Sequence, residues 1–211
     1  MITIWSDIHC PWAYVAILRL HRMRDHLGAD QLIFDLRSYP RELANGEATN
    51  AETAKREVVA LAQLEPTAFS ALHSETWPTT NLPAFEAQKW GFSQGQEIGE
   101  SFDLALRRAV FLHGHNLGVR SELLAVAETE GLEADQLGAA IDDGRFRKAV
   151  MTDLEDALGQ GVVGSPQVIL HDGTAHHNPG ITYRLERGIP IIVSDHPSVY
   201  EELIQVGSVE E

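Results

Sequence analysis

The stretch SDIHCPWAY, residues 6–14, holds the single cysteine of this 211-residue chain, Cys10. It follows residues 1–5, MITIW, which are apolar and rich in β-favouring side chains, so they predict a short buried strand. Pro11 suits the first turn of a helix, because a helix needs no intrahelical partner for that N–H. Apolar side chains then recur at helical spacing over residues 12–27. The stretch therefore predicts a strand, a short loop and a helix that starts beside the cysteine.

The rest of the chain divides into a helical middle and two β-containing ends. Residues 31–39, QLIFDLRSY, alternate in polarity and predict a second strand, which gives a β–α–β opening with a parallel pair and a right-handed crossover. Between residues 51 and 159 the patterns are almost all helical, and several segments stop at glycine. The β pattern returns at residues 161–173 and 188–195, and residues 198–207 predict a final helix.

Composition excludes several classes of function. The formal net charge is −15 and the pI is about 5.0, so phosphate backbones and anionic membrane surfaces would be repelled. One cysteine excludes an intrachain disulfide and favours a reducing compartment. No signal peptide or membrane-spanning apolar run is visible. We expect a cytoplasmic protein without nucleic-acid or membrane partners, and its oligomeric state stays open.

Three ordered motifs carry a resemblance to a known family. CPWAY at residues 10–14 resembles the CPWC-Y site of DsbA-like proteins, and GVVGSPQVIL at residues 161–170 resembles their cis-proline loop. Residues 108–132, RAVFLHGHNLGVRSELLAVAETEGL, resemble a helical segment of the same family. The family includes DsbA oxidoreductases and relatives similar to 2-hydroxychromene-2-carboxylate isomerase and kappa-class glutathione transferases. The resemblance covers roughly residues 1–170.

This resemblance, together with the order of the elements, implies an α/β fold of the thioredoxin-like type. Its elements would run β–α–β, then a large inserted all-helical domain, then β–β–α. We expect a discontinuous thioredoxin-like domain from residues 1–40 and 160–211, and a helical insertion domain from residues 41–159. Residues 174–190 depart from the family's usual ending, and we assign no role to them.

The resemblance also implies the positions of the site. Cys10 matches the nucleophilic cysteine, and Pro11 and Trp12 match the pair of residues that follows it. Pro166 matches the cis-proline, and Ser165 before it would present its backbone to a peptide or a small thiol. These four neighbours of Cys10 are the predicted substrate- or thiol-binding residues.

Ala13 stands where the family has its second, resolving cysteine. The thiolate is the reactive form of a cysteine, and a helix N-terminus favours that anion at Cys10. His9 is a possible modulator, since it would add positive charge when protonated. We expect Cys10 to be accessible in a cleft close to Pro166. Attack on a disulfide would leave a mixed disulfide that only an external thiol could resolve.

Three functions from different classes follow from these residues. The first is a monothiol, DsbA-like thiol–disulfide oxidoreductase that uses Cys10. The second is an isomerase or transferase that depends on glutathione or another small thiol and acts on a small organic substrate. The third is a non-catalytic binding protein that kept the cleft. No tightly bound cofactor is expected, and the cosubstrate would be glutathione or another low-molecular-weight thiol.

The histidines and the helical middle of the chain also bear on the site. The ten histidines predict no metal site, because none has a metal-ligand spacing and no second cysteine joins them. Residues 76–88 and 111–117 of the helical middle are candidates for a lid over Cys10, while Trp90 and Phe102 are assigned to the core of the helical segment itself.

Overall fold

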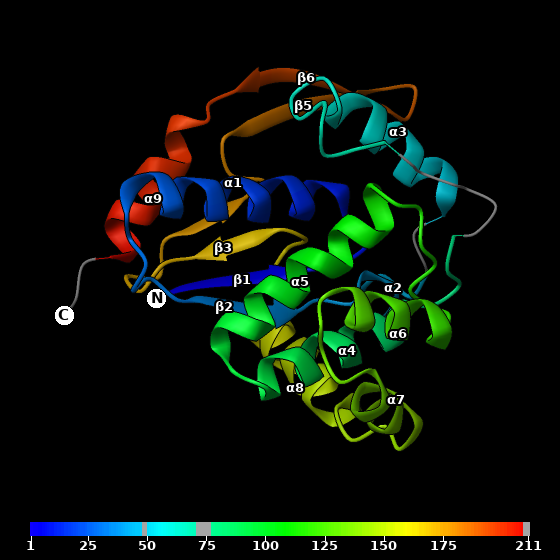
Figure 1. Cartoon of the computed structure of the whole chain (residues 1–211). Coiled ribbons are helices and arrows are strands. Elements are labelled where there is room, and N and C mark those ends of the chain that lie inside the picture. The colour runs from blue at the N-terminus through cyan, green and yellow to red at the C-terminus, as the bar shows by residue number, and fades with distance from the viewer. Residues whose placement is uncertain (48–49, 71–76, 209–211) are drawn as a thin grey trace.

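The computed structural model describes residues 1–47, 50–70 and 77–208, and a four-stranded mixed sheet lies at its centre (Figure 1). The sheet has the order β2-β1-β3-β4. Its strands are β1 (Ile2–Ser6), β2 (Phe34–Ser38), β3 (Gln167–Ile169) and β4 (Ala175–His177). β1 pairs in parallel with β2 and antiparallel with β3, so the two ends of the chain share one sheet. The predicted β–α–β opening is confirmed.

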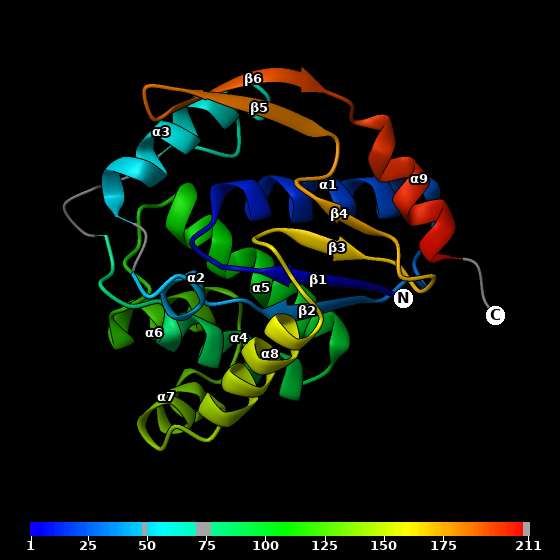
Figure 2. The ribbon, with the colours of Figure 1, turned by 180° about the vertical axis from the view of Figure 1, so that it is seen from behind.

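Helices surround this sheet (Figures 1 and 2). In the described residues they are α1 (Pro11–Leu27), α2 (Arg41–Ala44), α3 (Ala51–Leu61), α4 (Leu82–Ser93), α5 (Gln96–Phe111), α6 (Arg120–Thr129), α7 (Ala134–Asp142), α8 (Arg147–Gly159) and α9 (Ser198–Gly207). α1 begins at Pro11 as predicted. It ends at Leu27, and the capping residue Gly28 has a φ of 62°, a left-handed value that glycine adopts without strain.

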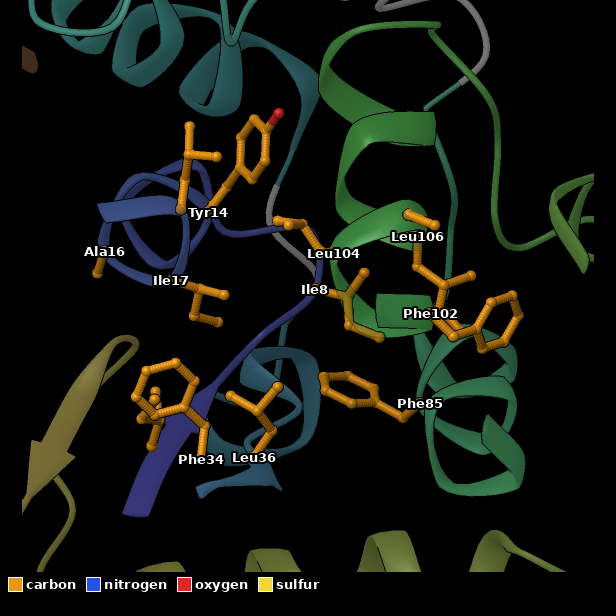
Figure 3. Close-up of a cluster of buried hydrophobic side chains, with 14 of the residues drawn as sticks. Ile8, Tyr14, Ala16, Ile17, Phe34, Leu36, Phe85, Phe102, Leu104 and Leu106 are labelled. Carbon is orange, nitrogen blue, oxygen red and sulfur yellow. The ribbon is translucent and has the colours of Figure 1, made fainter. Parts of the chain in front are cut away.

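Side-chain alternation divides β1 between two cores. Ile2 and Ile4 point into a large apolar cluster that also contains side chains of α1, α4, α5 and α9. Trp5 points to the opposite face of the sheet and packs with Ala157 of α8. Figure 3 shows how side chains from α1, β2, α4 and α5 converge in the large cluster, with Phe34 and Phe85 among them. The helical middle of the chain and the sheet therefore share one core.

The C-terminal strands correct one expectation. Residues 188–195 were expected to follow residues 161–173 as the second of the two final strands of the thioredoxin-like fold. Instead β5 (Ile181–Glu186) and β6 (Ile189–Asp195) form a separate two-stranded sheet, and β4 is the strand that pairs with β3. β4 was missed because a three-residue strand, Ala-His-His, carries no apolar alternation.

The β5–β6 hairpin lies over α1 and beside α3 (Figures 1 and 2). Arg19 of α1 holds the end of this hairpin, because its guanidinium donates to both carboxylate oxygens of Asp195 at 2.6 and 2.9 Å. The same side chain donates to Glu65, after α3, at 2.8 Å. Bidentate arginine–carboxylate pairs fix orientation as well as distance. One arginine thus joins α1 to both elements that lie above it.

The described strands all fall within residues 2–38 and 167–195, and the described part of residues 41–159 is helical or irregular. The division into two domains at residues 40 and 160 stays a prediction. Of the helices in the described ranges, none combines the length and the apolar run that crossing a membrane requires.

Candidate active site

Cys10 occupies the N-cap position of α1. Its carbonyl accepts the first helical hydrogen bond from the N–H of Tyr14 at 3.0 Å, and its own N–H donates to the carbonyl of Asp7 at 3.2 Å. The backbone N–H of Ala13 is directed at the sulfur and lowers the pKa of the thiol, although burial outweighs it. The local sequence therefore places the sulfur where free N–H groups of a helix start converge.

The predicted proline loop faces this sulfur. The Ser165–Pro166 peptide bond is cis, as expected, and the Cys10 thiol donates to the carbonyl oxygen of Ser165 at 3.2 Å. The hydroxyl oxygen of Ser165 accepts the N–H of Asp7 at 2.8 Å. Two segments about 155 residues apart in the chain are thus joined at Cys10. The backbone carbonyl of Ser165, expected to face a ligand, is occupied by the thiol instead.

Asp7, which the sequence analysis did not single out, anchors the loop before Cys10. Its fully buried carboxylate accepts the backbone N–H of His9 at 2.8 Å and that of Arg41 at 3.0 Å. The side-chain amide of Asn81 donates to it at 3.2 and 3.4 Å. A buried carboxylate with this many donors is stabilised rather than orphaned. Asp7 therefore links the ends of β1 and β2 to the start of α4.

The expected exposure of Cys10 is wrong, because the residue is 0% exposed. Its sulfur lies in an apolar cluster with Trp12, Ala13, Val15, Leu61 and Ile181. Trp12, 4% exposed, stacks on Tyr183 of β5 with ring centroids 4.5 Å apart. The β5–β6 hairpin and α3 thus cover the site. A sequence window around Cys10 contains no sign of them.

The segments proposed as a lid take other positions. Trp77 packs edge-on against His9 at 5.6 Å between ring centroids, and Asn81 binds Asp7, so these residues support the loop before Cys10. Phe111 stacks on Tyr14 at 5.3 Å inside the large core. Residue 76 lies outside the described residues. Trp90 and Phe102 pack edge-on against each other as core residues, but in the core that the helical middle shares with the sheet rather than in a separate helical core.

Burial raises the pKa of the Cys10 thiol, which reverses the expectation of a helix start that favours the thiolate. The positive charge of Arg41 lowers this pKa and the negative charge of Glu57 raises it. A side-chain hydrogen bond from the Ser165 hydroxyl lowers it as well. Burial outweighs the favourable contributions because the sulfur is fully enclosed. In this covered form the residue is a neutral thiol, as its S–H···O bond requires.

His9 is neutral rather than a source of positive charge. Burial lowers the pKa of its imidazole to about 4, and the charges of Arg107 and Arg41 lower it too, while Asp7 raises it. Neither ring nitrogen has a hydrogen-bond partner among the described residues. The role of His9 as a modulator through its charge is therefore not supported at neutral pH.

The His9 shift predicts a pH dependence of stability. The unfolded chain binds a proton at His9 below about pH 6.5, whereas the folded chain does so only near pH 4. His9 therefore leaves the free energy of unfolding unchanged above pH 6.5 and lowers it as the pH falls below that value. We expect His9→Phe to remove roughly 2–3 kcal/mol of the difference in unfolding free energy between pH 7.5 and pH 4.5. Urea unfolding at both pH values measures it. Equal differences for wild type and variant would contradict the assignment of a neutral, buried His9.

Arg41 and Glu57 are site residues that the sequence analysis missed. Arg41 is the first residue of α2, and its side chain is 15% exposed; Glu57 lies on α3 and faces the Trp12 indole N–H. Burial raises the pKa of the Glu57 carboxyl, and Arg41 and Trp12 lower it. Arg41 follows β2, whose carboxyl end meets that of β1 at one sheet edge, and this parallel pairing was the available signal. No local pattern marks Glu57.

The sheet, the helix start at Cys10 and the facing cis-proline loop define a thioredoxin-like protein with a one-cysteine site. The family model described as the DSBA-like thioredoxin domain matches residues 1–182. The chain therefore belongs to the DSBA-like thioredoxin family. A comparison with curated protein sequences gives no match.

Solved structures with the same fold are distant in sequence. A candidate protein disulfide isomerase from Nitrosomonas europaea is 12% identical, with a TM-score of 0.63 over 97% of this chain and 96% of its own. A 2-hydroxychromene-2-carboxylate isomerase is 17% identical, with a TM-score of 0.62 over 83% and 87%. The cytosolic disulfide reductase DsbM from Pseudomonas aeruginosa, solved with GSH, is 17% identical, with a TM-score of 0.58 over 83% and 89%. Redox and isomerase chemistry thus both occur on this fold.

Within the described ranges, no three His, Cys, Asp or Glu side chains gather as a metal ion would require. Two of these histidines make other contacts. His177 Nδ1 pairs with the carbonyl oxygen of Pro166 at 2.9 Å, and His115 pairs with Glu122 at 2.5 Å. His177 therefore supports the proline loop from β4.

Proposed function

We propose that this protein is a monothiol thiol–disulfide oxidoreductase in which Cys10 is the nucleophile and a small thiol such as glutathione resolves the intermediate. The observation that carries the proposal is the Cys10 sulfur at the start of α1, 3.2 Å from the carbonyl of Ser165 in the cis-proline loop. Pro11, Trp12, Ser165 and Pro166 form the surroundings of the reacting sulfur. A DsbM structure with GSH on the same fold supports the choice of thiol.

The reaction balances without a second cysteine. The Cys10 thiol loses its proton to solvent, and the thiolate attacks one sulfur of a disulfide. A Cys10–substrate disulfide forms as the substrate disulfide breaks, and the leaving thiolate takes a proton from water. One glutathione then attacks the mixed disulfide, so that the second substrate thiol leaves and a Cys10–glutathione disulfide forms. A second glutathione attacks the glutathione sulfur of that disulfide, which releases oxidised glutathione and regenerates the Cys10 thiol. Ala13 requires this external route because no other thiol exists in the chain.

The burial of Cys10 places one condition on the cycle. A disulfide reaches the sulfur only when the cover formed by the β5–β6 hairpin and α3 moves, because Cys10 is 0% exposed beneath it. The Trp12–Tyr183 stack is an aromatic contact between that hairpin and α1. Opening also admits water and so lowers the pKa of Cys10 from its raised, buried value.

The test is adduct formation with oxidised glutathione. Mass spectrometry should show one glutathione adduct on the wild-type chain and none on Cys10→Ala, since Cys10 is the single sulfur nucleophile. Free glutathione should then remove the adduct. Tyr183→Ala, which deletes the ring stacked on Trp12, should form the adduct faster than wild type. A chain that stays unmodified, even in the Tyr183→Ala form, would sink the proposal.

A second candidate function is a small-thiol-dependent isomerase or transferase, and the raised pKa of Cys10 favours it. In that case glutathione supplies the reactive sulfur and Cys10 helps to hold it. Calorimetric titration separates the two. Glutathione binding without any Cys10 adduct would favour the second function, and adduct formation favours the first. If glutathione neither binds nor forms an adduct, the non-catalytic binding protein is the function that remains.

A further inference from the structure

Arg41 lies beside Cys10 because of the parallel pairing of β1 and β2. Cys10 follows β1 and Arg41 follows β2, so both residues stand beyond the same edge of the sheet. The backbone N–H of Arg41 is fixed on the Asp7 carboxylate at 3.0 Å. Its positive charge lowers the pKa of Cys10, of Glu57 and of Tyr183, as expected of a guanidinium that lies near all three groups.

The guanidinium of Arg41 has unused donors. Its Nε and Nη2 atoms are buried and donate no hydrogen bond to any described residue. The nearest carboxylate oxygen, on Asp7, is 3.9 Å from Nε and already accepts the backbone N–H of Arg41. A buried donor without a partner is costly, and a buried arginine in particular is almost always paired. The pair Nε and Nη2 is one of the edges with which arginine binds a carboxylate through two parallel hydrogen bonds.

The environment of these donors selects the kind of partner. Glu57 Oε2 is likewise buried without a hydrogen-bond partner in the described residues, so this carboxylate does not use the free guanidinium edge of Arg41 either. The formal net charge of −15 gives the chain no general attraction for anions. An anion that binds beside Cys10 must therefore be held by a local contact.

We propose that Arg41 binds the carboxylate of the disulfide substrate or small thiol, and so selects carboxylate-bearing disulfides over neutral ones at Cys10. This inference rests on the proposed function, in which Cys10 attacks a small disulfide. The carboxylate accepts two hydrogen bonds from Nε and Nη2 of Arg41 while one disulfide sulfur meets the Cys10 thiolate. The Cys10–sulfur bond forms, the substrate disulfide breaks and the departing carboxylate-bearing thiolate takes a proton from water.

The test compares two disulfides of similar size that differ in charge. 3,3′-Dithiodipropionate carries two carboxylates and hydroxyethyl disulfide carries none. Mass spectrometry measures the rate of adduct formation at Cys10 with each disulfide, and the rate for the dianion is divided by the rate for the neutral disulfide. This ratio is then divided by the ratio obtained with the urea-unfolded chain, which corrects for the intrinsic reactivity of the two disulfides. This corrected ratio should be at least tenfold in favour of the dianion for the wild type. Because it needs no variant, it does not depend on how Arg41 replacements fold.

The variants then assign the preference to Arg41. Arg41→Gln should lower the corrected ratio about tenfold, and Arg41→Lys should recover part of it. Arg145→Gln is the matched control, because it removes the same charge from an exposed residue outside the cover of Cys10 and should leave the ratio unchanged. A wild-type ratio near one, or equal ratios for wild type and Arg41→Gln, would overturn the inference.

Binding of an unreactive ligand separates this inference from the proposed function. S-methylglutathione carries carboxylates but no free thiol, and calorimetry measures its affinity for wild type and Arg41→Gln. One outcome is that the wild type binds S-methylglutathione, Arg41→Gln does not, and the wild type forms no disulfide adduct. That outcome would refute the redox function and keep Arg41 as the carboxylate-binding residue. Adducts with a charge-independent ratio would keep the function and refute the role of Arg41.

Discussion

An Ala13→Cys variant is expected to reduce a peptide disulfide at least a hundredfold faster than the wild type when no monothiol is added. In the wild type the mixed disulfide at Cys10 waits for a thiol from solution. A thiol at position 13 is tethered, and its effective concentration exceeds that of millimolar free thiol. The structure places this position beside the sulfur, since the backbone N–H of Ala13 is directed at Cys10. The change is measured in a single turnover: reduced protein, freed of its reductant, is mixed with the peptide disulfide, and chromatography follows the release of the dithiol peptide.

The matched control is Ala16→Cys, one turn further along α1. Ala16 is also buried, at 2% exposed, but it lies in the large core rather than in the cluster around Cys10. It adds a second cysteine without placing it next to the first, so turnover should stay at the wild-type level. Wild-type turnover equal to that of Ala13→Cys, without added monothiol, would show that the missing cysteine does not limit the reaction.

Asp103→Ala is expected to lower the free energy of unfolding by about 3–5 kcal/mol. Asp103 and Arg107 are both 0% exposed, and Arg107 Nε donates to Asp103 at 2.8 Å. Removing the carboxylate leaves a buried guanidinium without its counter-charge. Arg107 also donates to the carbonyl of Asp7 and the hydroxyl of Ser6, at 2.9 and 2.8 Å, so the loop before Cys10 depends on it. Urea unfolding measures the loss.

Two further variants identify the cause of that loss. Replacing both partners, with Asp103→Leu and Arg107→Met together, should recover most of the stability, because no unpaired charge stays buried. Asp143→Ala breaks the exposed pair with Arg145 and should produce no measurable change. A double variant as unstable as Asp103→Ala would mean that the hydrogen bonds of Arg107, rather than its unpaired charge, carry the effect.

The fold was predictable where short-range patterns are strong. The apolar run before Cys10, Pro11 at the helix start and Gly28 at its end each reflect a local backbone preference, and the structure has β1 and α1 as expected. β4 was missed, and residues 188–195 were placed in the wrong sheet. Strand pairing is a long-range choice, and a three-residue polar strand offers no pattern from which to infer its partner.

The candidate site divides in the same way. The sequence alone determined that the single cysteine stands at a helix start and that the chain has no second thiol to resolve a mixed disulfide. It also determined that a proline loop resembles its family counterpart. These are properties of residue identity and local order. Only the tertiary structure decided that Cys10 is covered, that its pKa and that of His9 are shifted by burial, and that Arg41 and Glu57 stand beside it. Burial and charge depend on which distant segments pack together, and the β5–β6 hairpin and α3 reach Cys10 only through the fold.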